Sequence, residues 1–155
     1  MGLAWAAPRA LLQQHRLYDV CILGGANRVM MCAAIGEFDF GARCVQMTAD
    51  QVQHYHLWGR RFHAATQARI GHIDGRIIHL WHGDLQKRRY AERYRHLTRF
   101  EFDPFTDIAL DEAGCWRWAT PKTEMHQYVR SYFDFREEDG PRPLDVEAIR
   151  ERAAS

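Results

Sequence analysis

The stretch ADQVQHYHLWGRRFHAATQA, residues 49–68, decides how this chain folds. Its larger apolar side chains recur at spacings of three and four, at Val52, Tyr55, Trp58 and Phe62. This spacing places them on one face of a helix with about 3.6 residues per turn. Gly59 weakens the pattern, because glycine is a poor helix former. The stretch therefore predicts a long amphipathic helix in a helix-rich fold.

The segments before this helix predict a strand and two shorter helices. Residues 1–7 are apolar, which favours a buried strand. Pro8 then begins a helix through Gln14, because proline is tolerated in the first helical turn. Asn27 is expected to cap a second helix that ends at Gly36.

The segments after the long helix predict two hairpins, each a pair of short apolar runs around a turn sequence. The expected strand pairs are residues 70–73 with 76–81, and residues 107–110 with 115–119. No run of alternating strands and helices supports a complete parallel sheet. The sequence therefore predicts a fold of the α/β class. With few strands expected, the chain as it stands is an α-rich α+β protein.

Two more helices are expected in the second half of the chain. A basic helix is predicted over residues 85–97, with Tyr90, Tyr94 and Leu97 facing inward. Thr120-Pro121 is a typical helix start, with threonine as the cap and proline in the first turn. The helix that follows should present an apolar stripe made of Met125, Tyr128, Val129, Tyr132 and Phe133.

Length and composition set broad limits on the function. The chain has 155 residues and a formal net charge of +1, which predicts one domain and argues against nucleic acid as a partner. We expect this domain over residues 1–139, followed by a charged tail with a short helix over 140–155. The four cysteines form no C-x-x-C pair, so no thiolate zinc site is indicated. Cys32 lies in an apolar run as a small buried residue, and we expect a reduced, cytoplasmic protein. No apolar run approaches the about 20 residues of a membrane span.

The motif His79-Leu80-Trp81-His82-Gly83 is a candidate metal site. On a strand, residues three apart point to opposite faces, so both imidazoles bind one metal only if the strand ends between them. Gly83 allows such an end. The alternative is one histidine hydrogen-bonded in the core and the other on the surface.

Two further segments contain candidate ligand-binding residues. Gly24-Gly25 allows a sharp turn or a close approach of a ligand to the backbone. The basic segment around Arg89 and Tyr90 could bind phosphate through arginine and stack a ring on tyrosine. Each also has a plain structural interpretation, as a loop leading into a helix capped by Asn27 and as a solvated helix face.

Six short phrases occur in order along the chain. They are residues 2–9 around Trp5, Leu17-Tyr18-Asp19, Leu23-Gly24-Gly25, residues 78–83, Arg89-Tyr90, and Tyr132-Phe133 with Arg136. In this order they resemble the C-terminal half of GT-A-type glycosyltransferases of the family 2 and galactosyltransferase type, including bacterial and phage proteins. The resemblance covers most of the chain.

The resemblance implies a GT-A-like fold that transfers a sugar from a nucleotide-sugar donor to an acceptor hydroxyl. It also implies a divalent metal ion, usually manganese, held by His82 or His79. By position, Gly24 and Gly25 would border the carbohydrate acceptor. The other substrate-binding residues that it implies are Trp5, Arg89 and Tyr90.

The sequence departs from this family pattern in two places. Asn27 stands where the family has its base aspartate, and a neutral amide cannot accept the proton of the attacking hydroxyl. The chain also contains no Asp-x-Asp pair, which in the family belongs to the N-terminal nucleotide-binding half. We therefore expect a truncated glycosyltransferase-like chain that is weak or inactive alone.

Two functions from other classes compete with this interpretation. A metal-dependent hydrolase could use His79 and His82, although the near-neutral charge counts against a nuclease. A non-enzymatic binding or assembly module could expose an apolar face containing Trp5, Trp81 or Trp116. Such a face would be covered by self-association or by a partner chain.

Overall fold

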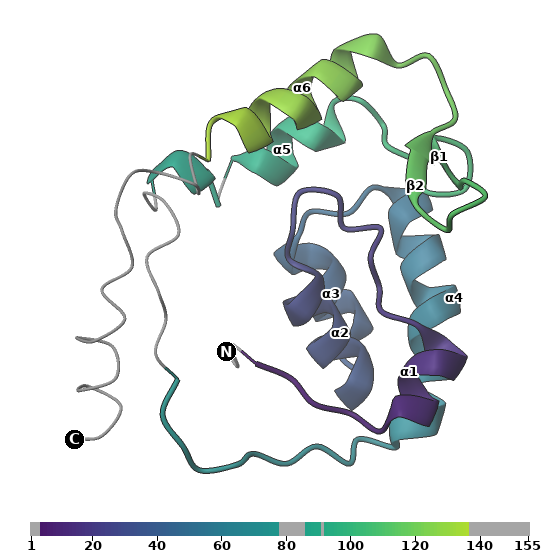
Figure 1. Cartoon of the computed structure of the whole chain (residues 1–155), viewed down its shortest axis with the longest axis vertical. Coiled ribbons are helices and arrows are strands. Elements are labelled where there is room, and N and C mark those ends of the chain that lie inside the picture. The colour runs from purple at the N-terminus through teal and green to yellow at the C-terminus, as the bar shows by residue number, and fades with distance from the viewer. Residues whose placement is uncertain (1–3, 78–85, 91, 137–155) are drawn as a thin grey trace.

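The computed structural model describes residues 4–77, 86–90 and 92–136. Four helices pack together in the first half, and in the second half two helices run side by side, with a two-stranded sheet between them along the chain (Figure 1). The described part is therefore α-rich α+β, as the sequence predicts. The elements are α1 (Arg9–His15), α2 (Ala26–Ile35), α3 (Phe38–Cys44), α4 (Ala49–Thr66), the 3-10 turn η1 (Gln86–Arg88), α5 (Arg93–Thr98), β1 (Ile108–Leu110), β2 (Trp116–Trp118) and α6 (Thr123–Asp134).

Helix α4 confirms the prediction made from the long amphipathic stretch. It begins with a capping box, in which Thr48 Oγ1 accepts a hydrogen bond from the backbone N–H of Gln51 and the Gln51 side chain accepts one from Thr48 N–H. Tyr55 and Phe62 are buried on its inner face. The Tyr55 hydroxyl donates to the backbone carbonyl of Val29 at 2.7 Å and so joins α4 to α2.

Gly59, which weakens the helical pattern in the sequence, lies where α4 meets α2 and α3. A Cβ atom placed on Gly59 would lie 2.9 Å from the ring of Phe38 and 3.5 Å from the Cβ of Ala33. The missing side chain therefore lets the helices approach closely, and this contact offsets the intrinsic cost of glycine in a helix. Helix α3, which contains Phe38, is a helix that the sequence analysis did not predict.

The second predicted hairpin is confirmed, with β1 and β2 antiparallel and Ile108 opposite Trp118. Its turn is held by Asp111, whose Oδ1 accepts hydrogen bonds from the backbone N–H groups of Ala113 and Cys115. Gly114 adopts a left-handed φ of 78° in that turn. Aspartate and glycine, which favour turns in general, therefore form the turn of this hairpin.

Several predictions for the other segments are wrong. Residues 4–7 and 70–77 form no strand, and residues 1–3 and 78–81 lie outside the described residues. The predicted basic helix is split, because η1 ends before Arg89, which has a positive φ of 43°, and α5 starts only at Arg93. Leu97 faces inward as expected, whereas Tyr90 is 50% exposed.

The cap of α2 also differs from the prediction. Gly25 is the N-cap, in a left-handed conformation, and Asn27 lies inside the first turn. The Asn27 side chain accepts a hydrogen bond from the backbone N–H of Arg28. Gly36 ends the helix in a left-handed conformation, as predicted.

Helix α6 begins at Thr123, three residues after the predicted cap, because Thr120 has another partner. The Thr120 hydroxyl donates to the carboxylate of Asp107 at 2.6 Å. That carboxylate is fully buried, and it also accepts from the backbone N–H of Asp103 and from Lys122 Nζ, both at 2.8 Å. The two segments that flank the hairpin are thereby tied together.

Burial alone would raise the pKa of Asp107, but the hydrogen bonds from Asp103, Lys122 and Thr120 outweigh it and hold the pKa below its ordinary value. The folded state therefore gains stability from the ionised carboxylate above the unfolded-state pKa of about 3.9. This contribution is lost as the pH falls through the lower folded-state pKa.

We predict that Asp107→Asn lowers the free energy of unfolding at pH 7 by about 1–3 kcal/mol, because a charged acceptor is lost while the shape is kept. The difference from the unsubstituted protein should shrink as the pH falls below about 4. Urea unfolding between pH 3 and pH 7 measures both effects. A difference that stays constant over this range would contradict the role of the ionised carboxylate.

Candidate functional site

The Gly24-Gly25 turn stands at the start of α2 in a conformation that favours glycine. Both residues have left-handed φ values, 88° and 91°. A Cβ atom on Gly25 would collide with the hydroxyl of Tyr94 and lie 2.9 Å from Val45 Cγ1. Glycine at position 25 is therefore required both by the backbone and by the close packing of α5 against the turn.

A hydrogen bond fastens this turn to α5. The Tyr94 hydroxyl donates to the backbone carbonyl of Gly24 at 3.0 Å, and Arg93 Nη2 donates to the same hydroxyl at 2.6 Å. Burial raises the pKa of Tyr94, although the neighbouring Arg93 acts in the opposite direction. The phenol therefore keeps its proton at neutral pH and remains a donor to Gly24.

Arg93 is the central residue of this region. Its side chain is buried, and its Nη1 donates to the hydroxyl of Tyr132 on α6 at 2.6 Å. The guanidinium also lies over the rings of Tyr90, Tyr94 and Tyr132, with its carbon 4.6–5.7 Å from the ring centroids. Within residues 4–77, 86–90 and 92–136, no carboxylate pairs with Arg93 and its buried Nε has no hydrogen-bond partner.

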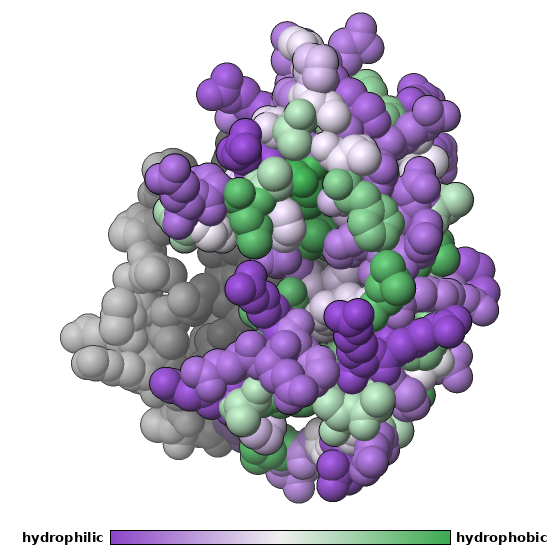
Figure 2. All heavy atoms as spheres, turned by 90° about the vertical axis from the view of Figure 1, so that its right-hand side faces the viewer, coloured by the Kyte–Doolittle hydropathy of each residue, from purple (hydrophilic) through white to green (hydrophobic). Residues whose placement is uncertain are grey.

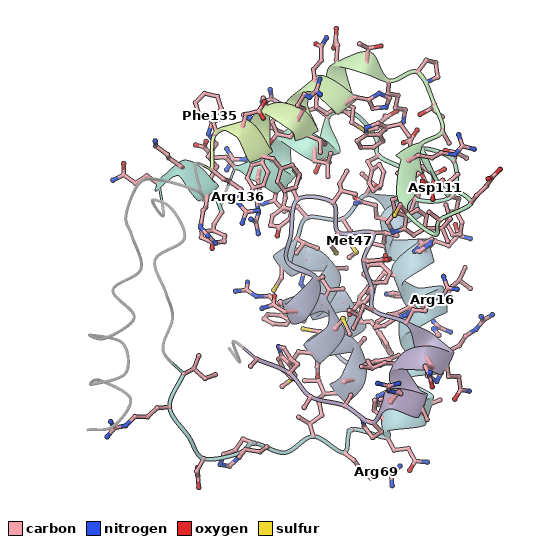
Figure 3. The ribbon with its side chains drawn as sticks, viewed as in Figure 1. Arg16, Met47, Arg69, Asp111, Phe135 and Arg136 are labelled. Carbon is pink, nitrogen blue, oxygen red and sulfur yellow. The ribbon has the colours of Figure 1, made fainter. Side chains whose placement is uncertain are left out.

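Other arginines and aromatic rings surround Arg93. Arg89 lies over the ring of Phe135 at 4.8 Å, and Arg136 lies over Tyr132 at 5.6 Å. Figure 3 labels Phe135 and Arg136, which lie together at the end of α6. We call this group the Arg–aromatic cluster, and it comprises Arg88, Arg89, Tyr90, Arg93, Tyr94, Tyr132, Phe133, Phe135 and Arg136.

The cluster has a buried part and an exposed part. Arg93 is buried against the glycine turn, whereas Arg89 and Tyr90 are exposed. A guanidinium binds phosphate oxygens through paired hydrogen bonds, and a tyrosine ring offers a flat face for stacking. The exposed part of the cluster can therefore bind an anion that carries a ring.

The region beside the turn is a surface rather than a deep pocket. The nearest cavity is lined by residues that include Tyr18, Leu23, Val45 and Tyr94, and its volume is about 20 Å³. This volume is about that needed for one water molecule. A ligand at this site would therefore lie over the Gly24 turn and the cluster, on a closely packed floor.

The structure brings together some of the predicted site residues. Gly24 and Gly25 meet the segment of Arg89 and Tyr90 through Arg93 and Tyr94. Arg93 and Tyr94 belong to the basic segment that the sequence analysis identified. Their contact with the glycine turn joins residues 70 positions apart, so no local sequence pattern could predict it.

The other predicted site residues lie elsewhere. Asn27 is exposed on the first turn of α2, two positions after Gly25. Trp5 is 51% exposed, and in the described part of the chain no hydrogen bond or ring contact joins it to the turn or the cluster. His79 and His82 lie outside the described residues. Among the described residues, no group of three His, Cys, Asp or Glu side chains could hold a metal ion.

Comparisons with known proteins give no match to a family, to a curated protein or to a solved structure. Among the helices of the described residues, none combines the length and the apolar character needed to cross a membrane.

We predict that Gly25→Ala destabilises the fold by about 3 kcal/mol, because left-handed strain of about 1–2 kcal/mol adds to the collision with Tyr94 and Val45. Gly114→Ala is the matched control, since Gly114 has a similar φ of 78° and no atom within 4 Å of its added Cβ. It should cost about 1 kcal/mol. Equal losses in urea unfolding would show that the packing at Gly25 contributes nothing.

We predict that Tyr94→Phe lowers stability by about 2 kcal/mol, because its hydroxyl accepts from a charged donor and fastens Gly24. Tyr90→Phe is the control, since the exposed Tyr90 hydroxyl accepts from Arg88 at 3.0 Å without touching the turn. It should cost less than about 1 kcal/mol. A larger loss for Tyr90→Phe than for Tyr94→Phe, measured by thermal unfolding, would contradict the arrangement described above.

Proposed function

We propose that this chain is the acceptor-side part of a GT-A-like glycosyltransferase, and that its Arg–aromatic cluster binds the diphosphate of a nucleotide sugar. One observation carries the proposal. The glycine turn and the basic segment, which are separate phrases of the resemblance, are joined by Arg93 and Tyr94 into one surface. Such an arrangement supports a common ligand for both segments.

The residue types suit the chemistry of sugar transfer. The leaving diphosphate gains negative charge in the transition state, and fixed cations beside it lower the barrier. Arg89 is exposed and offers its guanidinium to phosphate oxygens, while the half-exposed ring of Tyr90 offers a stacking face for a ring of the substrate. The buried Arg93 adds positive charge from beneath and keeps the Gly24 turn in place.

Asn27 limits what the chain can catalyse. In the family pattern its position belongs to the base that removes the proton of the acceptor hydroxyl. An amide can hydrogen-bond that hydroxyl but cannot take its proton. We therefore propose that this chain still binds the acceptor but transfers sugar to it only weakly.

The divalent metal that the resemblance implies would require His82 or His79. Both lie outside the described residues, so their geometry supports neither one nor the other. A bound manganese ion would neutralise charge on the diphosphate. The GT-A-like fold, the carbohydrate acceptor and a cytoplasmic location belong to the same proposal.

The proposal is tested by calorimetric titration of the full chain with UDP and with GDP, with manganese ions present. Uridine and guanosine serve as ligands without phosphate. We expect at least one diphosphate to bind at least tenfold more tightly than its nucleoside, a difference of about 1.4 kcal/mol. Arg89→Gln should remove most of this difference, because it removes the exposed guanidinium.

Arg99→Gln is the matched control, because Arg99 is an exposed arginine at the end of α5 outside the cluster. Its binding of diphosphate should be unchanged, and thermal unfolding should show that both variants are folded. Equal weakening by the two substitutions would indicate general charge attraction only. A folded protein that binds neither diphosphate at about millimolar concentration, the weak end of measurable affinity, would overturn the proposal.

A further inference from the structure

A groove lies on the side of the molecule formed by α1 and α4, away from η1 and the end of α6 (Figure 1). Its volume is about 320 Å³, within the range of about 300–1,000 Å³ that is typical of small-molecule sites. Figure 2 shows this side, where hydrophobic residues gather among hydrophilic ones. The groove is lined by Gln14, His15, His54, Leu57, Trp58, Arg61 and Phe105.

The aromatic walls of the groove are held in fixed positions. Trp58 stacks on Phe62 with ring centroids 4.7 Å apart, and its indole N–H donates to the backbone carbonyl of His15 at 2.8 Å. On the other side, the ring of Phe105 meets His54 edge to face at 4.9 Å. Side chains that are already held in place lose little conformational entropy when a ligand binds.

The polar groups of the groove favour an anion. Arg61 is exposed, His15 and His54 carry imidazoles, and Gln14 carries an amide, whereas no carboxylate lines the groove in the described part of the chain. Asp19 and Asp103 act on His54 from outside this lining, and burial lowers the pKa of His54 despite them. Arg61 therefore supplies the positive charge at neutral pH.

Two apolar residues at this groove remain uncovered by the rest of the fold. Leu57 is 53% exposed and Phe105 is 49% exposed, although both lie beside the half-buried Trp58. A planar ring placed between these side chains would remove apolar surface from water, which favours binding. The same ring would bring an attached carboxylate to the cationic lining.

We propose that this groove is a binding site for a small planar acid, an aromatic ring that carries one carboxylate. The ring lies against Leu57, Trp58 and Phe105, and the carboxylate is bound by Arg61. This site is separate from the Arg–aromatic cluster and does not depend on the proposed transfer reaction.

The test uses indole-3-acetate as the probe and indole-3-acetamide as its neutral counterpart, titrated into the full chain and followed by calorimetry and saturation-transfer NMR. We expect the acid to bind at least fivefold more tightly than the amide. Arg61→Gln should remove this preference and leave binding of the amide unchanged. Leu57→Ala should weaken both ligands, because it removes part of the apolar wall.

Arg60→Gln is the matched control, since Arg60 is the neighbouring exposed arginine on α4 and does not line the groove. It should leave the preference for the acid intact. The proposal is overturned if acid and amide bind equally to the unsubstituted protein. It is also overturned if neither ligand binds at about millimolar concentration, which corresponds to a very weak dissociation constant. It is also overturned if Arg60→Gln and Arg61→Gln have the same effect.

Discussion

The contacts of the buried Arg93 guanidinium with the surrounding tyrosines hold α5, α6 and the glycine turn together. Burying a charge costs several kcal/mol unless other groups take the place of water. Here the hydroxyls of Tyr94 and Tyr132 accept its hydrogen bonds, and the faces of three tyrosine rings surround it. These partners belong to α5, α6 and the segment between η1 and α5, so one side chain joins these three parts. Tyr94 then connects them to the first half of the chain through Gly24.

The same cluster contains both buried supporting side chains and exposed side chains. Arg93 is occupied by its tyrosines and is buried, so it holds the surface in place, whereas Arg89 and Tyr90 remain exposed on it. A preorganised cationic surface costs little reorganisation when an anion arrives. The groove beside Trp58 follows a similar principle, with a stacked and hydrogen-bonded ring beneath exposed apolar side chains.

Local signals in the sequence predict the local parts of this fold. The 3.6-residue period locates α4, Gly36 locates the end of α2, and Asp111 with Gly114 locates the hairpin. Local sequence patterns fail to predict the structure where a contact with a distant residue determines it. Thr120 does not cap α6 because Asp107 takes its hydroxyl, and the glycine turn requires Tyr94, 70 residues away. The structure brings Gly24 near the basic segment, and Arg93 and Tyr94, which join them, could be found only from the three-dimensional arrangement.

Asn27 lies exposed on the first turn of α2, and its side chain accepts a hydrogen bond from the adjacent backbone. A carboxylate in this place would face the positive end of the helix dipole, which stabilises negative charge by about 0.3–1 kcal/mol. Packing therefore does not impose the amide, and the fold accepts either side chain. A change between amide and carboxylate at this one position can therefore alter the charge at the start of α2 while the fold around it stays the same.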